Sequence, residues 1–299
     1  MKLLTRSLVR HAHAIAREVG AKGVLLYADV VEDDQDVADL IQDVNFRVLL
    51  VTRKPRIVAP EGWSELCTVV RVPDVPLTRA GRVKVALLVA AAEGLIRPNE
   101  RLVCMTGIDG SGTIDTIIVV EPGVEIELFT GPAADPLPAD VTPAVFERVL
   151  SLSTELGIEG REGRPVGALF VVGDHERVLE MSRQLVMNPF RGYAEAECNI
   201  LDPALEETLK EFSAIDGAFI IKGDGALLAA GRYLTPMRRP EIPLTRGLGT
   251  RHEAAVAITI SADAVAFCVS QSTGTVSIYR EGRLMADIQK PRSRVGEGY

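Results

Sequence analysis

One segment in the second half of the chain combines residue types that suit the chemistry of a nucleoside triphosphate: Gly249-Thr250-Arg251-His252. Thr250 predicts the N-cap of a following helix, whose unpaired N–H groups and dipole attract phosphate. Arg251 adds a planar, permanently charged fork for phosphate oxygens, and His252 can bind a metal ion through neutral imidazole. Cap signals occur in many sequences, so an ordinary capped helix explains this segment when it is taken alone.

A second segment, Ile215-Asp216-Gly217-Ala218, lies directly before a predicted strand. A carboxylate at Asp216 could hold Mg²⁺ or Mn²⁺, or accept a proton from an attacking hydroxyl. Gly217 would let a nucleotide approach the backbone closely. Asp-Gly is also a common turn pair, and a helix-to-strand turn is again the simpler interpretation of the segment taken alone.

Glu253 gives the first of these segments a further interpretation, because Thr250 to Glu253 fits the T-x-x-E pattern of a capping box. In such a box the Glu253 side chain would accept from the Thr250 N–H, while the Thr250 hydroxyl accepts from the Glu253 N–H. The alternative is that Glu253 helps to hold a metal ion. The sequence favours the capping box narrowly.

Strand-like and helix-like patterns alternate along the first half of the chain. Helices are predicted over 3–19, 37–44 and 82–95, and strands over 23–27, 47–52, 67–72, 101–106 and 116–120. This alternation predicts an α/β domain, with a mixed or parallel sheet flanked by helices. The loop over 107–113 follows a strand and is glycine-rich, but no lysine follows it as in a P-loop, so it predicts a structural loop.

Residues 131–142 contain three prolines and no apolar periodicity, which predicts a linker. The expected organisation is a first domain over 1–130, a second domain over 143–290 and a flexible tail over 291–299. In the second domain, Thr142 and Pro143 predict a helix start and Gly157 its end. The other predicted elements are helices over 177–186, from 202 and from 250, and strands over 166–172, 218–222, 226–230, 264–270 and 275–279.

Composition limits the kind of protein. The net charge is −8 and 47% of the residues are apolar, so the chain predicts a globular protein without a basic nucleic-acid face or charge-driven attachment to a membrane. Four separated cysteines predict reduced thiols rather than a zinc site or disulfides, and hence a cytoplasmic protein. The N-terminus lacks the apolar core of a signal peptide, and no stretch is apolar enough to span a bilayer.

Six motifs in order make residues 143 to 288 resemble the diadenylate cyclase domain, which occurs in the DNA-integrity scanning protein and in membrane-bound diadenylate cyclases. The motifs are residues 159–167 (EGREGRPVG), 173–174 (GD), 182–184 (SRQ) with 188–193 (NPFRGY), 216–218 (DGA), 233–234 (YL) and 249–252 (GTRH). The first half is similar to the C-terminal domain of pyruvate kinase, on the basis of residues 83–102 and of SGT at 111–113 followed by TI at 116–117.

The resemblance implies a nucleotidyltransferase that joins two ATP molecules into cyclic di-AMP and releases two pyrophosphates, with Mn²⁺ or Mg²⁺. It implies one ATP per protomer and two protomers that meet face to face. It assigns Asp216, Arg251 and His252 to catalysis, and Asp216 and His252 to the metal. The residues that it implies for ATP binding are Gly217, Ala218, Leu234, Gly249, Thr250, Arg251, His252, Glu253 and Ser270.

The sequence departs from the family pattern in two places. Glu253 stands where the family usually has a second arginine, and the loop from Ser270 to Gly274 lacks the acidic residues that are usual there. These departures leave a second hypothesis open: a degenerate domain that binds ATP or cyclic di-AMP without turnover. In a third hypothesis, the first domain is a sensor that controls the second.

Overall fold

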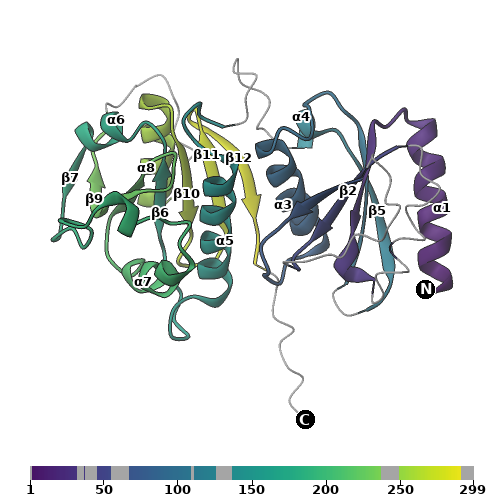
Figure 1. Cartoon of the computed structure of the whole chain (residues 1–299), viewed down its shortest axis with the longest axis horizontal. Coiled ribbons are helices and arrows are strands. Elements are labelled where there is room, and N and C mark those ends of the chain that lie inside the picture. Colours follow the sequence, from purple (N-terminus) through teal and green to yellow (C-terminus); the bar gives the residue numbers. More distant parts are fainter. Residues whose placement is uncertain are drawn as a thin grey trace, which may run out of the picture. The chain divides into compact units, whose positions relative to one another are not determined.

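A computed structural model describes residues 2–31, 37, 46–54, 67–108, 111–125, 137–236 and 249–290 of the chain (Figure 1). It divides the chain into two compact units, one of residues 1–74 and 79–136 and one of residues 75–78 and 137–299. Each unit contains a sheet of its own, which confirms the predicted α/β class. The first half of the predicted linker (131–136), all of the predicted tail and the predicted helix over 37–44, except Val37, lie outside the described residues.

The sheet of the first unit has the strand order β3-β2-β1-β4-β5. Its first four strands are parallel, and β5 pairs with β4 in the antiparallel direction. Every residue of the central strand β1 is buried, as the uninterrupted apolar run of a parallel strand requires. The strands are β1 (Gly23–Tyr27), β2 (Arg47–Thr52), β3 (Cys67–Arg71), β4 (Leu102–Gly107) and β5 (Ile114–Val120).

Helices cover both faces of this first sheet. Figure 1 shows α1 and α3 on either side of it. The helical elements are α1 (Leu3–Glu18), the 3-10 turn η1 (Ala28–Val30), α3 (Arg79–Ala92) and the short α4 (Pro122–Glu125). Among the described residues of the whole chain, no helix is both long enough and apolar enough to cross a membrane.

The second unit is built on a seven-stranded sheet with the order β12-β11-β10-β6-β8-β9-β7. Only β6 and β8 pair in parallel. Its strands are β6 (Leu169–Val172), β7 (Ser182–Gln184), β8 (Ala218–Ile221), β9 (Leu227–Leu234), β10 (Val265–Val269), β11 (Val276–Arg280) and β12 (Arg283–Ile288). Its helical elements are α5 (Pro143–Glu159), α6 (His175–Glu180), η3 (Glu195–Glu197), η4 (Pro203–Leu205), α7 (Glu206–Phe212) and α8 (Thr250–Ser261).

Strand β10 shows how α5 and α8 cover opposite faces of this sheet. Successive side chains of a strand point to opposite faces. Phe267 meets Phe146 of α5, with ring centroids 5.2 Å apart. Its neighbours Ala266 and Cys268 belong instead to the core cluster that includes the apolar side of α8, such as Ala255. The sheet is therefore covered on both sides at β10, and the apolar side of α8 packs against it.

Several predicted elements are confirmed, the predicted ends of two helices are wrong, and one strand was not predicted. Thr142 caps α5 as predicted, because its hydroxyl accepts from the Val145 N–H at 3.4 Å. However, α5 continues past Gly157 to Glu159. A side chain at Gly157 would lie 2.3 Å from the Gly274 carbonyl oxygen, so this glycine permits close packing and does not end the helix.

The predicted helix over 177–186 is also wrong, because α6 ends at Glu180 and residues 182–184 form strand β7. Hydrogen bonds with β9, which is distant in sequence, override the local helical pattern there. Strand β12 was not predicted, although it completes the edge of the sheet beside β11. The two strands are joined by the two-residue turn of Glu281 and Gly282, both with positive φ, which is a local hairpin signal.

Candidate active site

The predicted site residues gather where three neighbouring strands of the second sheet reach one edge. In the parallel pair, Phe170 of β6 lies beside Phe219 of β8. In the antiparallel pair, Leu169 of β6 lies beside Cys268 of β10. Continuing both registers places position 167 between positions 216 and 270. The structure therefore brings Asp216, which precedes β8, and Ser270, which follows β10, to the same edge as the start of β6.

Helix α8 begins above this edge and contributes Arg251. The Arg251 Nη2 atom lies 3.4 Å from the Asp216 Oδ1 atom. The Asp216 side chain is 89% exposed and the Arg251 side chain 32% exposed. An ion pair this long and this exposed contributes little to stability, so both groups can exchange it for a ligand at low cost. Two of the three predicted catalytic residues thus lie together and face solvent.

The amino end of α8 differs from its prediction. Gly249 is the N-cap, with an extended backbone (φ −69°, ψ 163°), and its carbonyl oxygen accepts from the Glu253 N–H at 3.1 Å. Thr250 is therefore the first helical residue and not the cap. The predicted capping box between Thr250 and Glu253 is wrong, because that box requires Thr250 at the N-cap position.

The corrected cap changes what this helix end can do. Gly249 has no side chain that could accept from the first N–H groups of α8. The His252 and Glu253 N–H groups donate to the Gly249 carbonyl oxygen, which leaves the Thr250 and Arg251 N–H groups and the positive end of the helix dipole for an anion. Arg251 adds its own charge at the same end. The arrangement can bind phosphate oxygens from the backbone and from one side chain together.

His252 lies half-buried on the side of α8 that faces β11. Its ring meets the ring of Tyr279 edge to face, with centroids 6.1 Å apart. Burial lowers the pKa of His252, although the nearby Asp287 carboxylate works in the opposite direction. The imidazole is therefore neutral at pH 7, which is the form that binds a metal or donates one hydrogen bond to a phosphate.

Asp216 and His252 suit a metal ion only in part. Among the described residues, no group of three or more His, Cys, Asp and Glu side chains could hold one. A divalent ion such as Mg²⁺ often takes one or two protein carboxylates and completes its shell with substrate phosphates and water. The exposed Asp216 carboxylate fits that pattern. A metal that arrives with a nucleotide therefore agrees better with these residues than a metal held by the protein alone.

Three further predicted residues have clear structural roles. Gly217 has φ +109°, and a Cβ atom there would lie 2.7 Å from the Arg232 backbone nitrogen. The pairing of β8 and β9 thus requires a glycine whether or not a nucleotide approaches. Ala218 and Leu234 are buried members of the core cluster. Their side chains pack beneath the site.

The loop after β10 forms a tight turn that begins at Ser270. The Ser270 N–H donates to the Thr275 carbonyl oxygen at 2.9 Å, and the Ser270 carbonyl oxygen accepts from the Gly274 N–H at 2.8 Å. The Ser270 hydroxyl lies 3.2 Å from the Ser272 hydroxyl. This loop offers hydroxyl groups to a ligand, whereas carboxylates would be the better ligands for a metal.

Gly167 is a residue of this site that the sequence did not single out for a role. A Cβ atom at position 167 would lie 2.6 Å from the Arg251 Nη1 atom. The guanidinium thus rests directly on the Gly167 backbone. The available signal was the place of Gly167 in the motif over residues 159–167, but only the fold shows that Arg251 lies over it.

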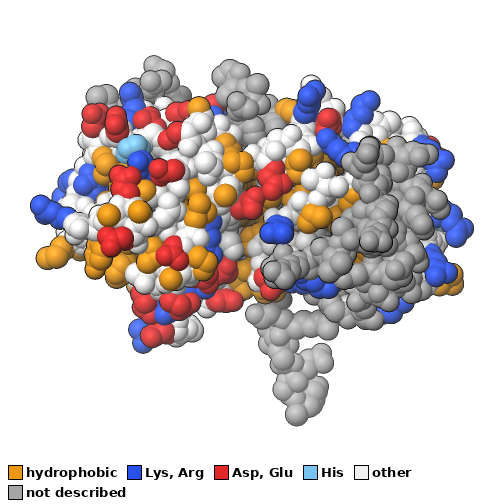
Figure 2. Space-filling view, in the orientation of Figure 1, with side chains coloured by type: hydrophobic (Ala, Val, Ile, Leu, Met, Phe, Trp, Pro, Cys, Tyr) orange, Lys and Arg blue, Asp and Glu red, His pale blue; other side chains and the backbone are white. Residues whose placement is uncertain are grey.

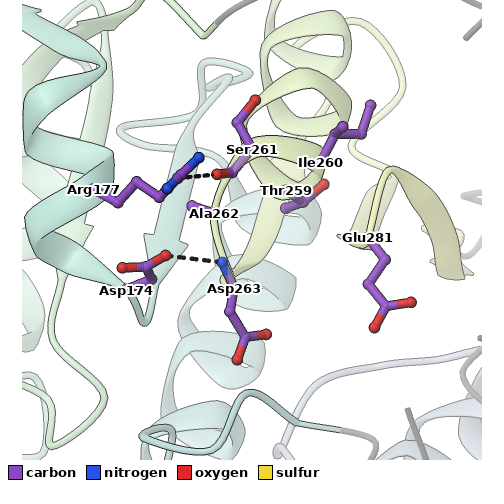
Figure 3. Close-up of a pocket in the computed structure, with 8 residues that line it drawn as sticks. All are labelled: Asp174, Arg177, Thr259, Ile260, Ser261, Ala262, Asp263 and Glu281. Carbon is purple, nitrogen blue, oxygen red and sulfur yellow. Dashed lines mark hydrogen bonds between the residues drawn. The ribbon is translucent and has the colours of Figure 1, made fainter. Parts of the chain in front are cut away.

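A pocket of about 590 Å³ lies at the opposite, carboxyl end of α8 (Figure 3). Figure 3 shows Asp174 and Arg177 directed at the end of this helix, where Asp174 accepts from the Asp263 N–H at 3.0 Å and Arg177 donates to the Ser261 carbonyl oxygen. None of the predicted site residues lines this pocket. Figure 2 shows acidic, basic and hydrophobic side chains interspersed on the visible face of this unit.

The fold and this site define a nucleotide-binding α/β protein, and comparisons with known proteins agree. The family described as "DisA bacterial checkpoint controller nucleotide-binding" matches residues 155–284. The family described as "Probable sensor domain DacZ_P" matches residues 4–130. The first match contains all six motifs of the second unit, and the second match covers most of the first unit.

Several proteins named diadenylate cyclase are similar to this chain. The one from Haloferax volcanii is 33% identical over 237 residues, which cover 78% of this chain and 84% of that protein. The one from Methanocaldococcus jannaschii is 35% identical over 202 residues, which cover 67% of this chain and 63% of that protein, just under two thirds of its length. One from Listeria monocytogenes is 39% identical over 75 residues, which cover 25% of this chain. The chain belongs to the diadenylate cyclase family.

Proposed function

We propose that the chain is a diadenylate cyclase that condenses two ATP molecules into cyclic di-AMP and releases two pyrophosphates. The observation that carries the proposal is the convergence of Arg251, Asp216 and the uncapped amino end of α8 at one sheet edge, in a member of the diadenylate cyclase family. Each protomer holds one ATP. Two protomers therefore face each other when the product forms, because the product contains two adenylates.

The reaction is an in-line displacement at the α-phosphate, and the site residues have different roles in it. The 3′-oxygen of one ATP forms a bond to the α-phosphorus of the other, and the bond from that phosphorus to the bridging oxygen of pyrophosphate breaks. Asp216 holds the attacking hydroxyl and accepts its proton. Arg251 and the first N–H groups of α8 bind the triphosphate and stabilise its charge, as phosphoryl transfer requires more positioning than covalent help.

The remaining site residues support this binding. Thr250, Glu253 and Ser270 border the triphosphate, and the backbone around Gly217 and Leu234 borders the nucleoside. Asp216 and His252 would hold the divalent ion, Mn²⁺ or Mg²⁺, that accompanies ATP. When bound, the ion neutralises phosphate charge and acts as a Lewis acid.

The first unit is proposed as a sensor domain that controls the second, in a cytoplasmic protein without nucleic-acid or membrane partners. The match over residues 4–130 to a family described as a probable sensor domain supports this role, while the N-terminal half also resembles the pyruvate kinase C-terminal domain. The resemblance concerns the fold and not kinase activity. Binding of a small molecule to the full chain that alters the rate of product formation would test it.

Mass detection of cyclic di-AMP from the purified chain, ATP and Mn²⁺ tests the proposed activity. We expect the product and two equivalents of pyrophosphate. A second candidate is a degenerate domain that binds ATP or cyclic di-AMP without turnover, and Glu253 and the acid-free loop from Ser270 to Gly274 favour it. Tight nucleotide binding without any product would support that candidate and overturn the cyclase.

A further inference from the structure

Gly167 differs from most other described glycines in what surrounds it. Its φ lies outside the left-handed region, so its backbone is one that any residue adopts. An added Cβ atom would meet Arg251 Nη1 at 2.6 Å, Gln271 Cβ at 3.0 Å and Arg251 Cζ at 3.1 Å. The closest contacts are therefore with the far end of a flexible side chain. At Gly107 or Gly157, in contrast, the closest atom is a backbone oxygen at 2.2 or 2.3 Å.

Because of these surroundings, a substitution at Gly167 can move the Arg251 side chain without disturbing the fold. Where a Cβ meets backbone, the fold itself must shift. At Gly167 the Arg251 guanidinium can move away, because its one hydrogen bond to a described side chain is the 3.4 Å contact with Asp216. An alanine at position 167 would therefore leave the sheet in place and displace the guanidinium from its present position. The missing side chain at Gly167 creates the space in which Arg251 lies.

The strand register explains why this space is located at the site. Gly167 precedes β6, the strand between β8 and β10. Arg251 lies over it, beside Asp216, which precedes β8, while Gln271, which follows β10, lies close to Gly167 on the other side. Burial raises the pKa of the Cys268 thiol to about 12, and the charge of Arg251 works in the opposite direction. Of the three adjacent positions 216, 167 and 270, the guanidinium therefore lies over the one that has no side chain.

We propose that Gly167 is a positioning residue, whose lack of a side chain holds the Arg251 guanidinium at the height where it meets the triphosphate. This inference rests on the proposed function and assigns a residue to that same site. Misplacing a group by about 1 Å can lower a rate by about a hundredfold. Gly167→Ala should therefore lower kcat/KM by about ten- to a hundredfold at an unchanged melting temperature.

A double-mutant cycle on the full chain tests whether the effect acts through Arg251. We compare three variants with the native chain: Gly167→Ala, Arg251→Ala and the double variant. Two quantities are measured: the rate of cyclic di-AMP formation, and the affinity for 3′-deoxy-ATP in the presence of Mn²⁺. This nucleotide lacks the 3′-hydroxyl and cannot form the new bond. We expect Gly167→Ala to weaken 3′-deoxy-ATP binding about tenfold in the native background and to have no further effect once Arg251 is alanine. Equal effects of Gly167→Ala in both backgrounds, or no effect in either, would overturn the proposal.

Two controls keep the outcomes distinct. If Gly167→Ala lowers the melting temperature, the Gly167→Ala/Gln271→Gly variant replaces it in the cycle, because it removes the second contact at 3.0 Å. If the native chain makes no cyclic di-AMP, the proposed function fails. The binding cycle then still decides whether Gly167 positions Arg251 against a triphosphate.

Discussion

The two ends of helix α8 differ in shape and in chemistry. The carboxyl end borders the pocket of about 590 Å³, but its polar groups, such as Asp174 and Arg177, already bind the backbone around Asp263. The amino end has Arg251 and an exposed Asp216 that bind each other only weakly, and first N–H groups that no described side chain caps. We therefore propose that a triphosphate binds at the amino end, where charge and hydrogen-bonding groups are available, and not in the hollow at the carboxyl end.

The largest effect should come from removing the charge of Asp216. Asp216→Asn keeps the size of the side chain, so the fold should remain, but the loss of proton acceptance and metal contact should lower cyclic di-AMP formation about a hundredfold or more. The matched control is Asp263→Asn at the other end of α8, where the carboxylate makes only an exposed 3.5 Å contact with Arg280. Near-normal turnover by Asp216→Asn would remove Asp216 from the site.

A second large effect should follow from dilution. In the proposed reaction the amino end of α8 binds one ATP per protomer, so two protomers would have to meet before the product can form. Specific activity should therefore fall when the protein is diluted below the dissociation constant of its assembly. Activity measured over a concentration series, with sedimentation on the same samples, checks this. A monomer with full specific activity would contradict the face-to-face arrangement.

Much of this site could be predicted from the sequence, because its parts are local. The Asp216 turn and the helix after Gly249 were both recognisable from residue type and spacing. The positions of Gly167 and Ser270 beside Asp216 could not be predicted, since they depend on the register of β6 with two strands that are distant in sequence.

The error at β7 has the same origin, because this strand pairs with β9, which is distant in sequence. Strand β12 was missed for a different reason: the local two-residue turn of Glu281 and Gly282, which joins it to β11, was not recognised. The predicted cap at Thr250 was wrong by one residue because glycine and threonine both suit an N-cap, and only the backbone angles of Gly249 decide between them.

A smaller effect is expected at the carboxyl end, and it should concern stability alone. Asp174 has φ +38° and accepts from the Asp263 N–H. Asp174→Ala loses that acceptor and places alanine in a left-handed backbone, so the free energy of unfolding should fall by about 1–3 kcal/mol. Asp174→Asn keeps an acceptor and tolerates that backbone, so it serves as the control. Urea unfolding measures the stability, and a large loss of turnover in a folded Asp174→Asn variant would show that this end also takes part in the reaction.

The smallest effect is expected for Glu253→Gln. Since Gly249 is the cap, Glu253 forms no capping box, and glutamine should leave the melting temperature unchanged. No group of three described acid, histidine or cysteine side chains includes Glu253. The Mn²⁺ concentration for half-maximal activity should therefore change by less than about twofold. A clear rise would make Glu253 a metal ligand that compensates for the acid-free loop after Ser270.

A crystal structure of the full chain with 3′-deoxy-ATP and Mn²⁺ would test the central claim most directly, because it locates the nucleotide at one end of α8 or the other. We predict triphosphate density against the N–H groups of Thr250 and Arg251, with the guanidinium of Arg251 over Gly167 and a metal ion beside Asp216. Nucleotide density in the pocket between Asp174 and Glu281, with the amino end of α8 empty, would contradict the assignment of the active site.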